Sequence, residues 1–430
     1  MRIRTLVIIA YCWLLAWQAS AFAALDLVLT QGIAGALPIA IVPFTGQALA
    51  TTDIASIIQA DLRNSGRFSI LEKLPATPHE SSAVESSIWR KAGVDSVVVG
   101  EMQAQGPDSF HVKFNLVDVY KADSGSALLK QEFTVNRSEL RRLAHHISDL
   151  IYQQLTGIRG IFSTRIAYIV VKHHDNGTQF VLEVADADGY NPHAIVTSAE
   201  PIMSPAWSHD GKRIAYVSFE NRRAQIFIST LATGERHLLT SYPGINGAPA
   251  WSPDDNKLAI VLSKGGSPNI YSLDLNTNRL QALTEGNNVI NTEPNWAPDG
   301  QSLVFTSDRG GSPQIYRLGL TDRHIERLTF DGNYNAHASY TPDGQRLVLL
   351  HRGNGMFVVA VQDLQKGRLQ SLTSSGRDES PSLSANATMV LYGSEFGKLG
   401  MVSIDGRVKL RLPARDGDVK EPVWSPFLSD

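Results

Sequence analysis

Histidines and carboxylates are the residues of this sequence that could do chemistry, and their spacing does not indicate a catalytic centre. His145 and His146 are adjacent in a segment, about 139–155, whose apolar residues recur at helical spacing. Neighbouring side chains on a helix point about 100° apart, so these two cannot easily share a metal ion. We expect both to be solvated helix residues. We expect the same of the segment His173 to Asp175, which falls in a predicted strand connection.

A metal-dependent hydrolase needs ligands that converge on one cavity, and the candidates Glu293, Asp378 and Glu379 are scattered along the chain. A serine hydrolase of the α/β type needs a Gly-x-Ser-x-Gly pentapeptide, which does not occur in the sequence. Gly93 and Gly100 do not form a glycine-rich phosphate loop, and there is no Walker-type sequence. These patterns argue against a serine hydrolase, a nucleotide-binding enzyme and a metal-dependent hydrolase, and we expect no cofactor and no metal ion.

A seven-residue phrase, Pro205-Ala-Trp-Ser-His-Asp-Gly211, recurs along the second half of the chain. Its further copies begin at Pro249, Pro294, Ala338, Pro381 and Pro422. The aromatic or leucine positions of the six copies are 207, 251, 296, 340, 383 and 424, so the steps between them are 44, 45, 44, 43 and 41 residues. Self-similarity at this period indicates a repeat architecture.

Each repeat predicts four β-strands. The phrase is a turn signature, and after it come a β-rich run such as Arg213–Val217, a Gly- or Ser-rich loop, an alternating strand such as Gln225–Ser229, and a run that ends in Leu-Thr. Four strands in about 44 residues is the size of one β-propeller blade. One repeat begins near residue 160 without the phrase, and the orphan copy Pro422–Pro426 can supply its inner strand. We therefore predict six blades, closed by the C-terminal strand beside Arg165–Val170.

The repeated tryptophan is interpreted as scaffold, because burying it between blades stabilises the fold and losing it should cost roughly 3–5 kcal/mol. Function is expected where the repeats differ, in the loops that enter the inner strands and those that join the second and third strands. These two kinds of loop fall on one face of a propeller. The variable segments are 242–248, 287–293, 333–337 and 377–379.

Residues 24–156 predict a mixed α/β domain in front of the propeller. Its strand candidates are 39–42, 68–71, 96–99, 111–119 and 127–135. Its helix candidates lie near 54–65, 84–92 and 139–155; Thr51 to Asp53 can cap the first one, and Gly66 can end it. The predicted fold is thus two domains, an N-terminal mixed α/β domain (24–156) followed by a six-bladed β-propeller (157–430) closed by the C-terminal strand.

Residues 1–23 have the order of a secretory signal peptide: basic residues, an apolar run from Leu6 to Trp17, and Ala21-Phe-Ala23 as a cleavage site. The apolar run, about a dozen residues, is short for spanning a bilayer. Cys12, the only cysteine, lies inside this segment, so the exported protein must be stabilised by its core rather than by disulfides. The formal net charge of −3 and the lack of a basic stripe argue against nucleic-acid binding.

The order of signal peptide, cysteine-free α/β domain and six-bladed propeller resembles the TolB family, the periplasmic components of the Tol–Pal system of Gram-negative envelopes. The stretches that carry the resemblance are Pro38–Phe44, Asn246–Asp254, Asn291–Trp296, Phe305–Asp308, Asp378–Leu383 and Leu412–Lys420. The resemblance covers the chain after residue 23, and it implies a periplasmic binding protein rather than an enzyme. The alternatives are an exported propeller hydrolase and a sugar-binding propeller.

The resemblance also implies partners. Members of the family bind the lipoprotein Pal across the propeller mouth and the inner-membrane protein TolA through their first mature residues, and the system supports outer-membrane integrity and invagination at division. Carried over by motif, the residues expected to face Pal are Asn246, Gly247, Ala248, Asn291, Thr292 and Glu293. Those expected to face TolA, by strand addition to a sheet edge, are Leu25, Asp26, Leu27, Val28 and Leu29. Other outer-membrane lipoproteins or porins are further candidate partners of what we expect to be a monomer within a larger envelope complex.

Overall fold

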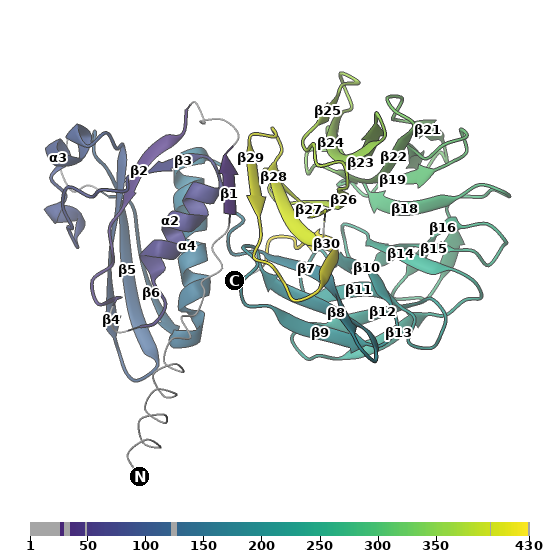
Figure 1. Cartoon of the computed structure of the whole chain (residues 1–430), viewed down its shortest axis with the longest axis horizontal. Coiled ribbons are helices and arrows are strands. Elements are labelled where there is room, and N and C mark those ends of the chain that lie inside the picture. The colour runs from purple at the N-terminus through teal and green to yellow at the C-terminus, as the bar shows by residue number, and fades with distance from the viewer. Residues whose placement is uncertain (1–25, 30–34, 48–49, 122–126, 396, 429–430) are drawn as a thin grey trace, which may run out of the picture.

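In a computed structural model the chain forms two bodies that lie side by side (Figure 1). The structure describes residues 26–29, 35–47, 50–121, 127–395 and 397–428. The predicted signal peptide, residues 1–23, therefore lies outside the described residues. Within those ranges, the structure contains no helix that is both long enough and apolar enough to cross a membrane.

A five-stranded sheet with the order β3-β2-β4-β5-β6 forms the smaller, N-terminal body. Its strands are β2 (Leu37–Ile41), β3 (Phe68–Ile70), β4 (Ser96–Ala104), β5 (Ser109–Asp118) and β6 (Ala127–Asn136). β2 runs parallel to both of its neighbours, whereas β4, β5 and β6 form an antiparallel meander. The predicted mixed α/β domain is confirmed, including the hairpin formed by its last two strands.

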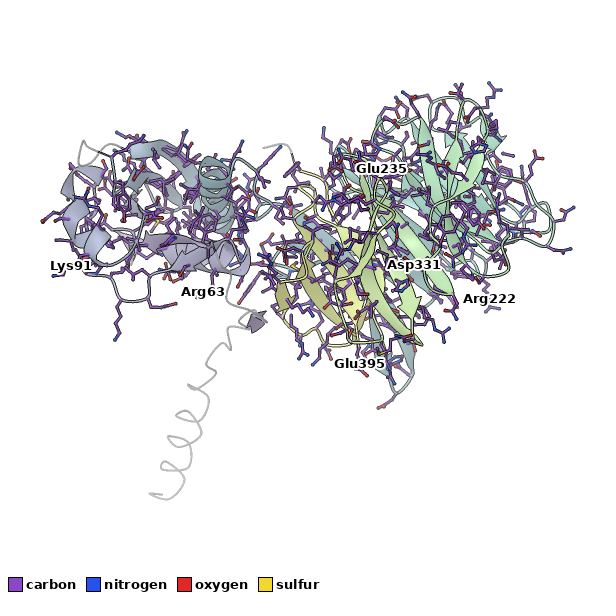
Figure 2. The ribbon with its side chains drawn as sticks, turned by 90° about the horizontal axis from the view of Figure 1, so that it is seen from above. Arg63, Lys91, Arg222, Glu235, Asp331 and Glu395 are labelled. Carbon is purple, nitrogen blue, oxygen red and sulfur yellow. The ribbon has the colours of Figure 1, made fainter. Side chains whose placement is uncertain are left out.

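Helices cover both faces of this sheet, as the unbroken apolar run in β4 predicts. The helical segments are α2 (Ile54–Asn64) and α4 (Leu140–Thr156) on one face, α3 (Ser86–Lys91) and a 3₁₀ turn, η2 (Ser81–Ala83), on the other, and η3 (Arg137–Glu139) before α4. Asp53 caps α2 by accepting a hydrogen bond from the Ser56 N–H at 3.1 Å, and Gly157 ends α4 in the left-handed conformation. Helices α2 and α4 lie between the sheet and the propeller (Figure 1), and Lys91 of α3 lies at the far end of the molecule (Figure 2).

Six antiparallel sheets form the larger body, and each is one blade of a propeller. The inner strands of neighbouring blades contact one another around the ring. With the inner strand first, the strands of blades one to three are β30 (Asp418–Trp424), β7 (Arg165–His174), β8 (Gly177–Asp186) and β9 (His193–Ser198); β10 (Ile202–Trp207), β11 (Arg213–Ser218), β12 (Gln225–Thr230) and β13 (Arg236–Thr240); β14 (Asn246–Trp251), β15 (Lys257–Leu262), β16 (Asn269–Asp274) and β17 (Leu280–Ala282).

Blades four to six repeat the same meander. Their strands are β18 (Asn291–Trp296), β19 (Ser302–Ser307), β20 (Gln314–Gly319) and β21 (Ile325–Arg327); β22 (Tyr334–Tyr340), β23 (Arg346–Gly353), β24 (Met356–Asp363) and β25 (Leu369–Ser371); β26 (Glu379–Leu383), β27 (Met389–Ser394), β28 (Lys398–Ser403) and β29 (Val408–Arg411). The six-bladed architecture predicted from the period is therefore confirmed.

The strand β30 completes blade one, as the orphan copy of the phrase predicts. It pairs antiparallel with β7, with Val419 opposite Val170 and Trp424 opposite Ile166. The indole N–H of Trp424 also donates a hydrogen bond to the Thr164 hydroxyl at 2.8 Å. The ring thus closes with no open sheet edge between the first and last blades.

The repeated tryptophans connect neighbouring blades. The indole N–H of Trp251 donates to the carbonyl of Ala206 at 3.0 Å, and that of Trp296 donates to the carbonyl of Ala250 at 3.1 Å. In both cases the acceptor belongs to the preceding blade. Trp251 is also buried among apolar residues of blades two and three. This geometry supports the interpretation of the phrase as scaffold.

The short strand β1 (Asp26–Leu29) does not join the α/β sheet, although it precedes that sheet in the sequence. It pairs antiparallel with β29, with Leu27 opposite Leu410 and Leu29 opposite Val408. Blade six therefore has five strands in the order β1-β29-β28-β27-β26. The N-terminal strand is thus attached to the outer edge of the propeller.

Candidate functional site

The loops that enter the inner strands lie on the same face of the propeller as the turns between second and third strands, because successive strands of each blade are antiparallel. We call this the loop face. It carries the variable segments 242–248, 287–293, 333–337 and 377–379, which lead into β14, β18, β22 and β26. The opposite face carries the repeated Asp-Gly turns. The loop face is therefore where the blades differ.

A buried polar side chain stands at the start of the inner strand in four consecutive blades. The four residues, each at most 3% exposed, are Asn246, Asn291, Asn335 and Asp378. The Asn246 amide accepts a hydrogen bond from the Tyr242 N–H at 2.9 Å and donates one to the Tyr242 carbonyl at 2.7 Å. Asn246 thus holds its own loop in place. Because it is buried, only the residues around it can offer their side chains to a partner.

Asn291 is the centre of a larger buried network. Its amide donates to Asn269 Oδ1 at 2.9 Å, and its Oδ1 accepts from Ser307 Oγ at 2.9 Å and from Arg309 Nη2 at 2.7 Å. Asn269 Oδ1 also accepts from the Thr284 hydroxyl at 3.1 Å. A buried network with its partners satisfied makes a loop rigid. The sequence reasoning missed it, although the Leu-Thr ending of each repeat, which includes Thr284, was an available signal.

Gly247, Ala248, Thr292 and Glu293 lie on the inner strands, which shift register at this point in both β14 and β18. Ala248 and Glu293 have positive φ angles of 43° and 53°, which is the geometry of a β-bulge. The same position has a positive φ in every blade, at Ser204, Ala248, Glu293, His337, Ser380 and Glu421. The predicted residues therefore belong to a sixfold ring of bulges on the inner strands.

Within this ring, Glu293 and His337 form an ion pair between adjacent blades, with Nδ1 of the histidine 3.7 Å from Oε1 of the glutamate. The carboxylate also accepts from the Thr306 hydroxyl at 2.7 Å and from the His337 N–H at 2.9 Å. Burial alone would raise the pKa of Glu293, but these hydrogen bonds and the imidazolium charge lower it to about 2. Burial likewise opposes the charge on His337, yet the bond to Glu293 raises its pKa. Each residue therefore favours the charged form of the other.

The carboxylates that the sequence offered as metal ligands do not converge. Asp378, which leads into blade six, is buried and accepts hydrogen bonds from the hydroxyls of Thr373 and Ser375, which follow the last strand of blade five. Among the described residues, Glu293, Asp378 and Glu379 form no group with metal-ligand spacing. In that part of the chain, such a group occurs at the junction of the two domains, from Asp61, His145 and Asp188.

His145 is not a solvated helix residue, so this prediction was wrong. It is 2% exposed, and its Nδ1 lies 2.8 Å from Asp61 Oδ2 on α2. Its Nε2 lies 3.7 Å from Oδ2 of Asp188, in the turn between β8 and β9 of the propeller. Burial alone would lower the pKa of His145, but the two carboxylates raise it to about 9. The helical period could not show that the propeller covers this side of α4.

The junction group is better described as an ion-pair cluster than as a metal site. Arg141, one turn before His145 on α4, pairs with Asp188 and lies 3.4 Å from Asp186. The two cations of α4, Arg141 and His145, are therefore already engaged in ion pairs with the carboxylates around them. His146 fits the prediction better, since it is partly exposed with its ring edge-on to Phe133. The segment His173 to Asp175 is exposed as expected, but His173 and His174 end strand β7 rather than lie in a connection.

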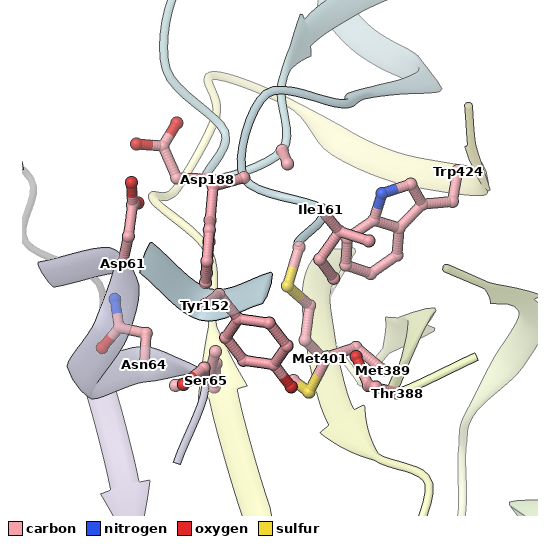
Figure 3. Close-up of a pocket in the computed structure, with 13 residues that line it drawn as sticks. Asp61, Asn64, Ser65, Tyr152, Ile161, Asp188, Thr388, Met389, Met401 and Trp424 are labelled. Atoms are coloured by element: carbon pink, nitrogen blue, oxygen red, sulfur yellow. The ribbon is translucent and has the colours of Figure 1, made fainter. Parts of the chain in front are cut away.

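A mainly apolar pocket adjoins this cluster (Figure 3). Its walls come from α2, α4, the interdomain connection and blades one and six, and include Asp61, Tyr152, Ile161, Met389, Met401 and Trp424. Figure 3 shows the Tyr152 ring of α4 beside Met401 of the propeller. The two domains thus meet through a charged cluster next to an apolar pocket.

Large apolar side chains are exposed on the loop face. Ile245, Ile290 and Phe330 are 46%, 48% and 72% exposed in the loops that enter three consecutive inner strands, and Met356 is 49% exposed at the turn between β23 and β24. We call these four residues the apolar rim. Exposed apolar patches commonly mark protein–protein contacts. The variable loops predicted from the sequence contain Ile245 and Ile290, and an apolar side chain in a polar turn was the signal that could have singled out these two isoleucines.

The residues expected to face TolA are paired within the chain. Asp26, Leu27, Val28 and Leu29 form β1 on the edge of β29, and Leu25 lies outside the described residues. Strand addition to a sheet edge is the mode of contact that the sequence suggested. Here the edge that receives the strand belongs to the chain's own propeller.

Comparisons with known proteins agree with this architecture. Residues 25–124 match the family model of the TolB amino-terminal domain, and residues 152–428 match that of the TolB beta propeller domain. The Tol-Pal system protein TolB of Coxiella burnetii (strain RSA 493 / Nine Mile phase I) is 50% identical, with 96% of this chain and 97% of the relative covered. That of Legionella pneumophila (strain Corby) is 54% identical, with 94% and 96% covered. The crystal structure of TolB from Acinetobacter baumannii has a TM-score of 0.85 at 40% identity and covers 94% of this chain and 100% of that one. The chain therefore belongs to the TolB family of Tol–Pal system proteins.

Proposed function

We propose that this chain is a non-enzymatic binding component of the periplasmic Tol–Pal system. Its loop face would bind the lipoprotein Pal, and its residues 25–29 would bind TolA. Through these two contacts it would support outer-membrane integrity and invagination during division. Membership in the TolB family supports the place in the system, and the geometry of the loop face supports the kind of contact.

The apolar rim is the observation that carries the proposal. Ile245 and Ile290 each directly precede a buried anchor, Asn246 or Asn291, whose hydrogen bonds hold the loop in place. A partner that binds a rigid loop does not have to order it, so more of the contact energy appears as affinity. Apolar side chains on rigid loops are thus suited to a folded protein partner such as Pal.

The polar residues expected to face Pal would act in two ways. Asn246 and Asn291 are buried and would position the loops, whereas Gly247, Thr292 and Glu293 are partly exposed on the inner strands. The partly exposed residues lie below the rim and offer backbone and side-chain polar groups. Such an arrangement places an apolar contact beside hydrogen-bonding groups, as is usual at protein interfaces.

The strand β1 supports the proposal for TolA. Among the described residues, four residues of β1 pair with β29, and so short an edge pairing can be exchanged for pairing with the edge of another sheet. β29 belongs to the same sheet as β26, whose entering loop, 377–379, lies on the loop face. Blade six thus connects the position of β1 to the surface proposed for Pal. A coupling of about 1–3 kcal/mol between the position of β1 and the surface proposed for Pal would change Pal affinity about 5–150-fold.

Calorimetric titration with purified Pal tests the loop face. Ile290→Asp places a charge in the apolar rim and should weaken binding at least about tenfold. Leu238→Asp is the matched control, because Leu238 has the same 48% exposure but lies on β13, the outermost strand of blade two. Wild-type protein that does not bind Pal, or an Ile290→Asp variant that binds as well as the control, contradicts the proposal.

Deletion of residues 25–29 tests the N-terminal strand. The shortened protein should lose retention on immobilised TolA, and its Pal affinity should change by the factor given above. Unchanged TolA retention contradicts the proposed contact. Unchanged Pal affinity contradicts the coupling through blade six. The Pal site itself is tested separately, by the Ile290→Asp variant.

A further inference from the structure

The side chain of Met356 is the feature from which we infer a further site, one of covalent modification. It is 49% exposed. The other methionines of the described part of the chain lie within apolar clusters or against them: Met102, Met203, Met389 and Met401. A thioether is oxidised where a reagent in solution can reach it. Among the described methionines, Met356 is therefore the one most open to such a reagent.

The Met356 sulfur has a defined place in the apolar rim. Met356 begins β24, directly after the turn of Asn354 and Gly355 on the loop face. Its side chain lies against the loop that leads into blade six, because a Cβ added to Gly376 would meet Sδ of Met356 at 3.3 Å. The backbone fixes this approach, since the Phe357 N–H donates a hydrogen bond to the Gly376 carbonyl at 3.1 Å. The thioether thus stands where two loops of the surface proposed for Pal meet.

We propose that Met356 is a site of reversible oxidation that weakens the contact of the apolar rim with Pal. The inference rests on the function proposed above. The reagent is a two-electron oxidant that reaches an exported protein from outside the cell, such as hypochlorous acid. In the net reaction an S–O bond forms and the O–Cl bond breaks. Sulfur loses two electrons, chlorine leaves as chloride, the proton passes to solvent, and the product is methionine sulfoxide.

The sulfoxide changes the rim in two ways. Its oxygen is a strong hydrogen-bond acceptor, so a partner that covers Met356 would bury a polar group in an apolar contact. The oxygen also needs space beside Gly376, whose backbone lies close to the thioether. Ile245, Ile290 and Phe330 carry hydrocarbon side chains without sulfur. Met356 is therefore the member of the rim that this chemistry makes polar.

The exported chain has no thiol that could intercept the oxidant or reverse the reaction. Its single cysteine, Cys12, lies in the predicted signal peptide. Methionine sulfoxide is returned to the thioether by dedicated reductases, one for each epimer. Repair of Met356 must therefore come from such a reductase, which supplies two electrons and releases the oxygen as water.

Calorimetric titration with Pal before and after mild oxidation tests the inference. Wild-type protein, residues 24–430, is treated with a limiting amount of hypochlorous acid, and peptide mass spectrometry measures the sulfoxide at each methionine. Met356 should be oxidised before the buried Met389 and Met401, and Pal affinity should fall roughly tenfold as its sulfoxide accumulates. Methionine sulfoxide reductases with dithiothreitol should restore the affinity. Bound Pal should slow the oxidation of Met356, because it covers the sulfur.

Three variants separate Met356 from the rest of the chain. Met356→Leu keeps an apolar side chain of similar size, so it should bind Pal as the wild type does and keep this affinity after treatment. Met356→Gln places a polar amide in the rim and should bind weakly without any oxidant. Met203→Leu is the matched control, because it removes a partly buried methionine and leaves Met356 in place. It should lose affinity on oxidation as the wild type does.

The possible failures are distinguishable. Untreated wild-type protein that does not bind Pal contradicts the proposed function and this inference with it. Wild-type protein that binds Pal equally well before and after oxidation of Met356 overturns the inference alone. A Met356→Leu variant that loses as much affinity on treatment as the wild type overturns it as well, because the effect would then come from another residue.

Discussion

The Nδ1 atom of His145 lies 2.8 Å from the Oδ2 atom of Asp61, and this contact joins α4 to α2 at the surface that meets the propeller. The other ring nitrogen faces Asp188 of the propeller at 3.7 Å. One buried imidazole thus takes part both in the packing of the α/β domain and in the junction between the domains. Its protonation should therefore affect the stability of both.

Stability should fall as the pH rises through the folded-state pKa of His145. That pKa is raised from 6.5 to about 9 by the two carboxylates, against the effect of burial. The stabilisation is therefore fully present below about pH 6.5 and is lost progressively up to about pH 9, with a size on the order of 3 kcal/mol. Urea unfolding at pH 6 and near pH 9.5 measures it. His145→Gln should remove most of the difference, and a variant with the wild-type pH dependence would assign the effect to another group.

Glu293→Gln should lower the pKa of His337. The carboxylate that raises this pKa would be replaced by a neutral amide, which leaves burial to disfavour the imidazolium. The His337 ring signals in an NMR titration report the midpoint directly. Ser380 occupies the equivalent position on the inner strand of blade six and provides a control. Ser380→Ala should leave the midpoint of the His337 titration unchanged.

Trp251→Ala should destabilise the propeller by roughly 3–5 kcal/mol, because it removes a buried aromatic side chain between two blades. Trp251→Phe keeps most of the apolar contact but loses the indole donor to the Ala206 carbonyl, so about 1–3 kcal/mol is expected. Denaturant unfolding gives both values. Equal losses in the two variants would show that the hydrogen bond, rather than the packing, holds the blades together.

Asn291→Ala should lower the free energy of unfolding by about 1–3 kcal/mol, because the Asn269 and Arg309 side chains each lose a hydrogen-bond partner in a buried network. It should also weaken Pal binding by loosening the loop of Ile290, which hydrogen exchange of the Ile290 amide would report. Asn287→Ala, an exposed position in the same loop, is the matched control and should change neither quantity. Faster exchange in the control variant would mean that the loop depends on more than the anchor.

Gly100→Ala should destabilise the α/β domain, although the substitution adds one methyl group to a strand. A Cβ at this position would lie 2.4 Å from the Phe44 ring, on the face of the sheet that α2 and α4 cover. Overpacking of this kind costs typically about 1–3 kcal/mol, measurable as a lower midpoint of urea unfolding. Gly100→Ala with Phe44→Leu should recover part of the loss if the clash is its cause.

Features that repeat were predictable from the sequence. The phrase around Trp207 recurs with a period long enough for four strands, so the number of blades followed from counting its copies. The orphan copy at Trp424 can only complete the blade of β7, so closure of the ring followed as well. Strands and helices of the α/β domain followed from local periodicity, with Asp53 and Gly66 marking the two ends of α2. Each of these inferences depends on residues close together in the chain or on a pattern stated several times.

Features that depend on contacts between distant segments were not predictable. The helical period gives the direction of His145 on α4, but only the arrangement of the two domains shows that Asp188 faces it. The pairing of Leu27 with Leu410 joins residues far apart in the sequence that share no pattern. The assignment of Asn246 and Asn291 to contact with Pal stays a prediction, and their burial now places the exposed surface on the neighbouring Ile245 and Ile290.

The position of β30 also has a consequence for the order in which the chain folds. Blade one takes its three outer strands from residues 165–198 and its inner strand from residues 418–424. As the chain is synthesised, the inner edge of β7 must therefore remain unpaired until more than two hundred further residues have been added. A chain that stops before Asp418 leaves that edge exposed and prone to association. The ring can therefore close only after β30 has been made, and a chain truncated before β30 is distinguishable from a full one by an open first blade.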